Sequence, residues 1–214
     1  MGPGMARLDH LAIRAPTLEA GVAFVEAALG VPLAAGGAHP AMGTHNRLLS
    51  LGPGEYLEVI AVDPAARRPA RRRWFGLDRP PGRPELCAWV VGVADLSAAL
   101  SRAPAGCGAP MALSRGDLRW RMAVPESALD SALEQGPWDG LFPALTEWEG
   151  VLHPAARLPD HGLRLTALQL VHPDAAGLRA ALAEVIDDVR VSVAAGSAPG
   201  IRACVQTPTG ERWL

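Results

Sequence analysis

The sequence contains no lysine, only three cysteines and no long run of apolar residues. The absence of lysine, with arginine in its place, fits a bias in nucleotide composition and has little functional weight. The cysteines, at positions 87, 107 and 204, are odd in number and have no CxxC spacing, so we expect reduced thiols. No window approaches the roughly 18 apolar residues of a membrane span, and the N-terminus lacks the apolar run of a signal peptide. These absences predict a cytoplasmic protein that does not enter a membrane.

The charge of the chain is nearly balanced. Arginine supplies all 20 positive side chains against 22 acidic ones, and a net charge of -2 creates no field that would attract nucleic acid or an anionic membrane. The arginines at 67–73 lack interleaved aromatic residues and are interpreted as part of a solvated connector. With 214 residues, 49% of them hydrophobic, the chain is long enough to bury a sizeable core. A small molecule is therefore the expected partner.

A strand and an amphipathic helix open the chain. In residues 8–15, Leu11 and Ile13 alternate with small or polar side chains, as in a strand with one apolar face. A helix capped by Thr17 is expected to follow and to end at Gly30. This helix should cover the apolar face of the strand, which leaves the polar side chains on the opposite, concave face of a sheet.

Further strands and helices follow in a repeating order. A loop rich in Gly and Pro is expected at 31–43, and residues 126–135 fit a short helical turn. The similarity of LDHLAIRAPTLEAG, from Leu8, to LTALQLVHPDAAGL, from Leu165, is the strongest sign of repetition. The other expected strands span residues 46–51, 56–62, 86–93, 118–124, 142–148, 163–171, 189–193, 201–206 and 211–214, and the other expected helices span 95–100 and 174–186.

Two polar residues in the middle of strands are the first candidates for chemistry. His10 lies among apolar neighbours, and Glu58 lies in the segment Tyr-Leu-Glu-Val-Ile. A carboxylate inside a sheet is costly unless it is paired or coordinates a metal, and neutral imidazole is a common metal ligand. The two residues therefore indicate either part of a metal site or a hydrogen-bonded pair on a polar sheet face.

A metal site needs at least one more ligand. Glu147, at the end of a later strand, is the best candidate, and the alternative is that its side chain is solvated. His45, beside Asn46, is another candidate, although its position in the strand could equally place it outward. Arg14 shares a strand face with His10 and is expected either to hold an anionic group of the substrate or to lie at the rim.

Two tryptophans complete the candidate residues. Trp120 and Trp148 are either core residues or the walls of an apolar pocket. With Arg14, His45 and Asn46 they form the expected substrate-binding set. No GxSxG elbow or Cys/His motif is present, so hydrolysis by a nucleophilic side chain is not expected.

Four segments carry a resemblance to a known family. LDHLAIRAPTLEAGVAFVEAALGV, GGAHPAMGTHNRLLSLG, GEYLEVIAVDP and the later LFPALTEWEGVLHP resemble glyoxalase-like proteins of the vicinal-oxygen-chelate (glyoxalase/bleomycin resistance/extradiol dioxygenase) superfamily. The resemblance implies an α+β fold of repeated βαβββ modules that form curved mixed sheets with helices on the outer face. It implies a module at 5–84 and further modules at 85–214, with a less regular middle at 85–160 and a βαββ unit at 163–214. A homodimer is implied as well.

The same resemblance implies a divalent metal ion (Zn, Ni, Mn or Fe) in the concavity of the sheet. His10 matches the first-strand ligand and Glu58 the last-strand ligand of the first module, whereas Ala88 and Ala167 occupy the equivalent first-strand places later in the chain. Glu147 remains the candidate for a third ligand by its position at the end of a later strand. The metal would polarise a small oxygen-rich substrate while Glu58 or Glu147 moves a proton, as in a lyase, isomerase or dioxygenase. The alternative function is metal-free binding or sequestration of a small molecule.

Overall fold

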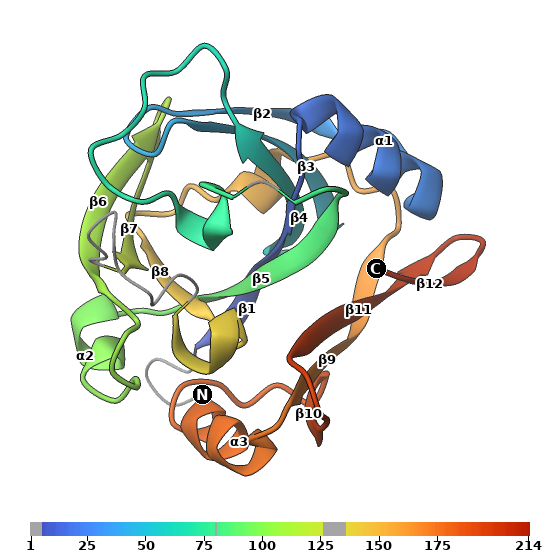
Figure 1. Ribbon diagram of the computed structural model, residues 1–214. Coiled ribbons are helices and arrows are strands. Elements are labelled where there is room, and N and C mark those ends of the chain that lie inside the picture. Colours follow the sequence, from blue (N-terminus) through green and yellow to red (C-terminus); the bar gives the residue numbers. More distant parts are fainter. Residues whose placement is uncertain (1–5, 80, 126–135) are drawn as a thin grey trace.

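The structure is a computed structural model that describes residues 6–79, 81–125 and 136–214. Its strands form one sheet of eight strands and one of four (Figure 1). The helical turn expected at 126–135 lies outside the described residues. In the part of the chain that is described, no helix is long and apolar enough to cross a membrane.

The first module supplies half of the eight-stranded sheet. Its elements are β1 (Arg7–Arg14), α1 (Leu18–Leu29), β2 (Ala34–His39), β3 (Thr44–Gly52) and β4 (Glu55–Val62). Thr17 caps α1 by accepting a hydrogen bond from the Ala20 amide, and Gly30 ends the helix with a φ of 75°. After the helix, β4 returns to pair in parallel with β1, which closes one βαβββ unit.

The second module repeats this order. Its elements are β5 (Glu85–Gly92), α2 (Leu96–Leu100), β6 (Ala109–Arg115), β7 (Leu118–Val124) and β8 (Ala144–Trp148). β5 pairs antiparallel with β1, and β8 pairs in parallel with β5, so the strand order is β2-β3-β4-β1-β5-β8-β7-β6. The sheet curves until its two edge strands approach each other: a Cβ added to Gly37 of β2 would lie 2.7 Å from Arg115 Cδ of β6.

The C-terminal unit forms the four-stranded sheet. Its elements are β9 (Arg164–His172), α3 (Ala175–Ala183), β10 (Val191–Ala195), β11 (Gly200–Thr207) and β12 (Gly210–Trp213), in the order β10-β9-β11-β12. Leu168 and Leu170 of this sheet belong to the same buried core as the first module. Arg190 adds a polar link, because its guanidinium donates to Glu55 at 2.6 and 2.8 Å. In Figure 1 this unit lies beside the curved sheet.

The core lies between the convex face of the large sheet and its covering elements. Leu11 and Ile13 of β1 are fully buried and belong to one cluster with Val25 of α1, so the expected cover of this face is confirmed. Gly21 permits the close approach, since a Cβ there would lie 2.4 Å from Val59 Cγ1. The expected α+β fold of βαβββ modules, with curved mixed sheets and outer helices, is confirmed. The expected domain bounds remain a prediction.

Two strands occur where the sequence pattern predicts none. β2 lies within the expected loop at 31–43, and β6 begins at the end of a segment rich in Gly and Pro. β2 is an edge strand that main-chain hydrogen bonds to β3 hold in place. At Gly36 a Cβ would lie 2.1 Å from Asn46 Oδ1, so this stretch needs glycine and shows little alternation of side chains. Pairing with a neighbour, rather than local pattern, makes it a strand.

Candidate functional site

A small polar cavity lies on the concave face of the large sheet. Its volume is about 30 Å³, which is room for about one or two water-sized groups. The side chains that line it are His10, His39, Tyr56, Glu58, Trp74, Phe75, Arg115, Trp120, Met122, Thr146 and Trp148. Titratable side chains gathered in a concave, aromatic-lined space are typical of functional sites.

An irregularity in β1 brings Asp9 next to His10 in space. The pairing of β1 with β5 shifts register between Leu8 and His10, so the two side chains do not simply point to opposite faces. His10 Nδ1 lies 2.6 Å from Asp9 Oδ1, and His10 Nε2 lies 3.8 Å from Glu58 Oε2. All three side chains are buried. Asp9 thus holds the imidazole with Nδ1 as donor and with Nε2 facing Glu58.

Asp9 is the most strongly hydrogen-bonded carboxylate of this cluster. Besides His10, it accepts hydrogen bonds from Trp148 Nε1 at 2.8 Å and, at 3.0 Å, from His153 Nε2, in the loop after β8. Burial by itself would raise the pKa of Asp9, but the hydrogen bonds and charges of His10 and His153 hold it well below its usual value. Asp9 therefore remains an anion that joins β1 to the end of the second module.

Glu58 is held by an amide from the next strand. Asn46 of β3 donates to Glu58 Oε1 at 2.5 Å, and its own Oδ1 accepts from the Gly37 amide of β2 at 2.8 Å. The second carboxylate oxygen is the one that faces His10. Asn46 thus fixes one oxygen of the Glu58 carboxylate, and the side chain lines the small cavity.

His39 at the end of β2 completes the polar wall. Its Nδ1 lies 3.1 Å from Thr44 Oγ1, and its Nε2 lies 3.4 Å from both Asn46 Nδ2 and Arg115 Nη1. Burial lowers the pKa of His39 to about 4, with Glu58 opposing the shift and Arg115 adding to it. The ring is therefore neutral at neutral pH. Two donors at Nε2 assign the proton to Nδ1, which donates to Thr44.

Aromatic rings enclose these polar groups. Tyr56 stacks on His10 with ring centroids 4.4 Å apart, and Trp120 lies 5.2 Å from Trp148. Trp74, in the short helix η1 (Trp74–Gly76), packs edge-on against His39 at 5.1 Å. These walls limit contact with bulk solvent, which strengthens the electrostatic interactions inside the cavity.

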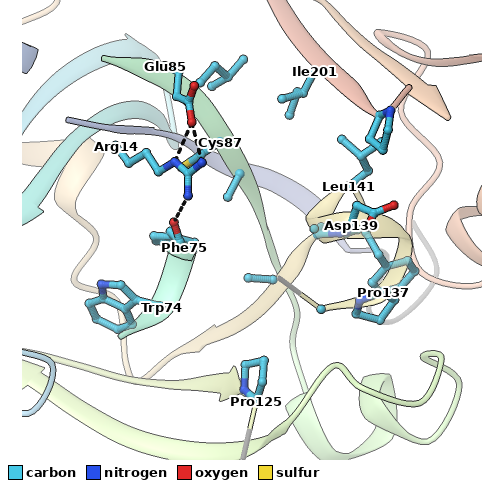
Figure 2. A pocket seen from close by; sticks show the side chains of 18 of the residues that line it. Arg14, Trp74, Phe75, Glu85, Cys87, Pro125, Pro137, Asp139, Leu141 and Ile201 are labelled. Atoms are coloured by element: carbon cyan, nitrogen blue, oxygen red, sulfur yellow. Dashed lines mark hydrogen bonds and ion pairs between the residues drawn. The ribbon is translucent and has the colours of Figure 1, made fainter. Parts of the chain in front are cut away.

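A much larger pocket lies beside the small cavity. Its volume is about 740 Å³, within the usual range for sites of small ligands. In Figure 2, Arg14 and Glu85 lie on one side of it, Pro137, Asp139 and Leu141 lie opposite, and Ile201 comes from the four-stranded sheet. Its apolar lining includes Leu86, Ala88, Val124, Leu141, Phe142, Ala144 and Ile201, and its arginines are Arg14, Arg72, Arg73 and Arg83.

Trp74, Phe75 and Met122 line both cavities. Phe75 has a φ of 54°, an uncommon conformation for a side chain of this size. Its carbonyl accepts a hydrogen bond from Arg14 Nη1 at 3.2 Å, and Arg14 in turn pairs with Glu85 at 2.5 Å (Figure 2). A ligand that contacts these three shared residues would therefore touch both spaces.

The two thiols in the large pocket are poor nucleophiles. Cys87 Sγ donates to the Ala12 carbonyl at 3.3 Å. Burial raises the pKa of Cys87 to about 12 and that of Cys107 to about 11. Both side chains are therefore protonated at neutral pH, and a covalent step at either sulfur is not supported.

The structure brings some of the expected site residues together and separates others. The small cavity or its wall contains His10, Asn46, Glu58, Trp120 and Trp148, and Arg14 lines the large pocket. His45 is adjacent to the inward-facing Asn46 and so lies on the opposite face of β3. Glu147 accepts hydrogen bonds from the Leu96 amide at 2.7 Å and from Arg121 at 2.6 Å. It therefore lies at the start of α2 and outside the cavity.

The residues present do not fit the metal site that the resemblance implies. Among the described residues, no three His, Cys, Asp or Glu side chains form a group that could hold a metal ion. In the first module, Glu58 of β4 is the strand partner of Ala12, which lies two residues after His10. In the second module, Ala144 of β8 is the strand partner of Val90, which lies two residues after Ala88. Ala88 and Ala144 thus stand where the second module would supply ligands, and both line the large pocket.

Several site residues are missing from the expectations made from sequence. Asp9 directly precedes His10, and its place in an otherwise apolar strand was a usable signal. His153 lies in the quoted segment LFPALTEWEGVLHP, but nothing in that segment indicates that it meets Asp9. His39 and Arg115 carry no local signal, since they meet across the two edges of the sheet.

Fold and site together define a protein of the vicinal-oxygen-chelate type in which only one module has kept polar residues at the ligand places. The sequence matches the family described as glyoxalase-like domain over residues 8–186. The chain therefore belongs to this family. No curated protein matches it significantly.

Several solved structures are similar to this one. A hypothetical protein from Staphylococcus aureus is 12% identical, with a TM-score of 0.62 and coverage of 91% of this chain and 88% of that chain. A methylmalonyl-CoA epimerase from Streptomyces coelicolor, in complex with 2-nitronate-propionyl-CoA, is 17% identical, with a TM-score of 0.45 and coverage of 70% and 99%. The epimerase from Mycobacterium tuberculosis is 18% identical, with a TM-score of 0.42 and coverage of 68% and 88%. The similarity to the Staphylococcus aureus protein shows the fold alone, and a shared fold does not fix function.

Proposed function

We propose that this protein binds a small molecule with an apolar body and an anionic group in the large pocket. The observation that carries the proposal is the pocket itself, which combines a volume of about 740 Å³ with an apolar lining and arginines. Apolar surface provides affinity, and a few placed charges select and orient the ligand. Ala88 and Ala144 stand where the second module would supply metal ligands, and both line the large pocket. Their methyl groups give the pocket an apolar surface, which supports this function.

The charges around the pocket favour an anion. Arg14 is paired with Glu85, and Arg73 is paired with Asp78 at 2.6 Å. Arg83 is exposed and makes no ion pair with any other described residue. Its guanidinium is therefore free to pair with a carboxylate, sulfonate or phosphate group of a ligand.

Binding of anilinonaphthalene sulfonate, an apolar anionic fluorophore, tests this proposal. The substitution Ala88→Leu places extra volume in the pocket and should weaken binding about tenfold, or about 1.4 kcal/mol. Ala98→Leu, at an exposed position of α2, is the matched control and should bind like the parent. Arg83→Gln should weaken the sulfonate and leave binding of a neutral naphthalene unchanged. Equal affinity in the parent and in Ala88→Leu would place the ligand elsewhere.

An acid–base enzyme is the second candidate, and the buried chain of Asp9, His10 and Glu58 favours it. A carboxylate fixed by Asn46 and facing an imidazole is suited to move a proton to or from a bound molecule. Exchange of the C–H protons beside the carbonyl of a methyl-ketone carboxylate, followed by NMR in deuterated water, tests this activity. Glu58→Gln should abolish the exchange, whereas Glu149→Gln, at an exposed position, should not.

Elemental analysis of the purified protein tests the metal-dependent alternative. If the parent contains near-stoichiometric divalent metal and the double variant His10→Ala, Glu58→Ala does not, the result would support a metal-dependent lyase, isomerase or dioxygenase. We expect no such metal, because the second module supplies alanines at its ligand places. A homodimer and a cytoplasmic location remain predictions.

A further inference from the structure

Two hydrogen-bond donors in the wall of the small cavity lack good acceptors among the residues that the structure describes. Trp74 is 8% exposed, and its Nε1–H group is buried without a hydrogen-bond partner among the described residues. Within the described residues, the Arg115 guanidinium makes one hydrogen bond, a long one of 3.4 Å to His39 Nε2, and no ion pair. A buried donor without an acceptor is costly, so such groups usually mark the place of a water or a ligand atom.

We propose that the small cavity is an oxygen subsite, in which Trp74 and Arg115 donate hydrogen bonds to one carbonyl or hydroxyl oxygen of the bound ligand. This inference rests on the proposed function, because the body of that ligand lies in the large pocket. The volume of about 30 Å³ admits about one or two groups the size of a water molecule. The ligand class is therefore an apolar molecule with an anionic group at one end and an uncharged oxygen at the other.

Charge in the cavity selects an uncharged oxygen. The Glu58 carboxylate lies in the wall of the cavity, and the Asp9 carboxylate lies behind His10. A carboxylate group of the ligand would therefore be repelled from this space. The neutral ring of His39 leaves Arg115 as the cationic donor without adding a second positive charge beside it. The anionic end of the ligand is thus directed toward the arginines of the large pocket.

The two spaces are contiguous along shared side chains. Trp74, Phe75 and Met122 line both cavities, so a ligand in the large pocket that extends past Met122 reaches the donors. Arg115 is held against β2, because Gly37 leaves room for its side chain. The guanidinium therefore has a defined position before the ligand arrives, which reduces the entropy lost on binding.

Matched pairs of simple acids test the subsite. Methyl-ketone carboxylates of increasing chain length are compared with straight-chain alkanoates of the same number of carbon atoms, and dissociation constants are measured by calorimetry. At the length that spans the two spaces, the ketone should bind about tenfold more tightly than its alkanoate partner. The length series removes the need to know the span beforehand.

Two substitutions locate the effect. Trp74→Phe removes the indole donor but keeps an aromatic ring, and Arg115→Met removes the guanidinium but keeps the aliphatic stem. Each should reduce the preference for the ketone severalfold and leave the affinity for the alkanoate near that of the parent. Trp213→Phe and Arg179→Met, at exposed positions, should keep the full preference.

The outcomes separate this inference from the function on which it rests. If the parent binds both acids of every pair equally while Ala88→Leu weakens both, the large pocket binds ligands and the oxygen subsite is wrong. If the parent binds neither acid at any length, both proposals fail. Because the parent's own preference is a result, the test does not depend on the folding of the variants.

Discussion

Protonation of His39 should destabilise the fold below neutral pH. The ring is 5% exposed, and burial lowers its pKa to about 4 from an unfolded value of 6.5. Because the folded state favours the neutral ring, folding releases a proton when the pH is below the unfolded pKa. The stability is therefore complete above about pH 6.5 and is lost as the pH falls toward about 4.

The size of the effect follows from the two pKa values. Between about pH 7 and about pH 5 the unfolded chain takes up nearly one proton that the folded ring does not, which costs about 2 kcal/mol. Part of that cost is the repulsion between a charged His39 and the nearby Arg115. The substitution His39→Gln removes the titration and keeps a polar side chain, so its stability should not carry this pH dependence.

Urea unfolding followed by tryptophan fluorescence measures this difference at both pH values. The parent should lose about 2 kcal/mol more than His39→Gln over the interval, whatever the cost of the substitution itself. His161→Gln, at a loop position, controls for the removal of a histidine and should keep the parent's slope. Equal pH dependence in the parent and His39→Gln would refute the assignment of a buried, neutral His39.

Three further substitutions test the structure away from that ring. Trp148→Phe removes the 2.8 Å hydrogen bond to buried Asp9 and should cost about 2 kcal/mol of unfolding free energy; a loss below about 0.5 kcal/mol would contradict the Asp9 cluster. Leu11→Ala, at a fully buried site, should lower the urea midpoint by an amount equivalent to about 3 kcal/mol, with an unchanged m-value. Arg190→Met removes a partly exposed link to Glu55 and should cost only about 1 kcal/mol, but it should speed hydrogen exchange in the four-stranded sheet more than in the large one.

The local pattern of the sequence predicts the modules well. Alternation in β1 and the capped helix after it require only neighbours in the chain, so Leu11 and Ile13 are correctly assigned to the covered face. The same alternation places His10 and Glu58 on the concave face, where the structure has them 3.8 Å apart. The alternation of apolar and polar side chains does not predict β2, because its glycines have no side chains to alternate. It is a strand because its main chain pairs with β3.

What the sequence by itself determined is the repeated strand-and-helix order, and with it the fold class and the polar face of β1 and β4. Only the tertiary structure decided which polar groups meet: Arg115 and His39 are 76 residues apart and come together because the sheet curves until its edges face each other. The bulge that turns Asp9 toward His10 likewise arises from pairing with β5. Local patterns specify which face of a sheet a side chain occupies, whereas strand register and sheet curvature depend on contacts between strands that are distant in the chain. The set of residues that form the site therefore could not be predicted from the sequence.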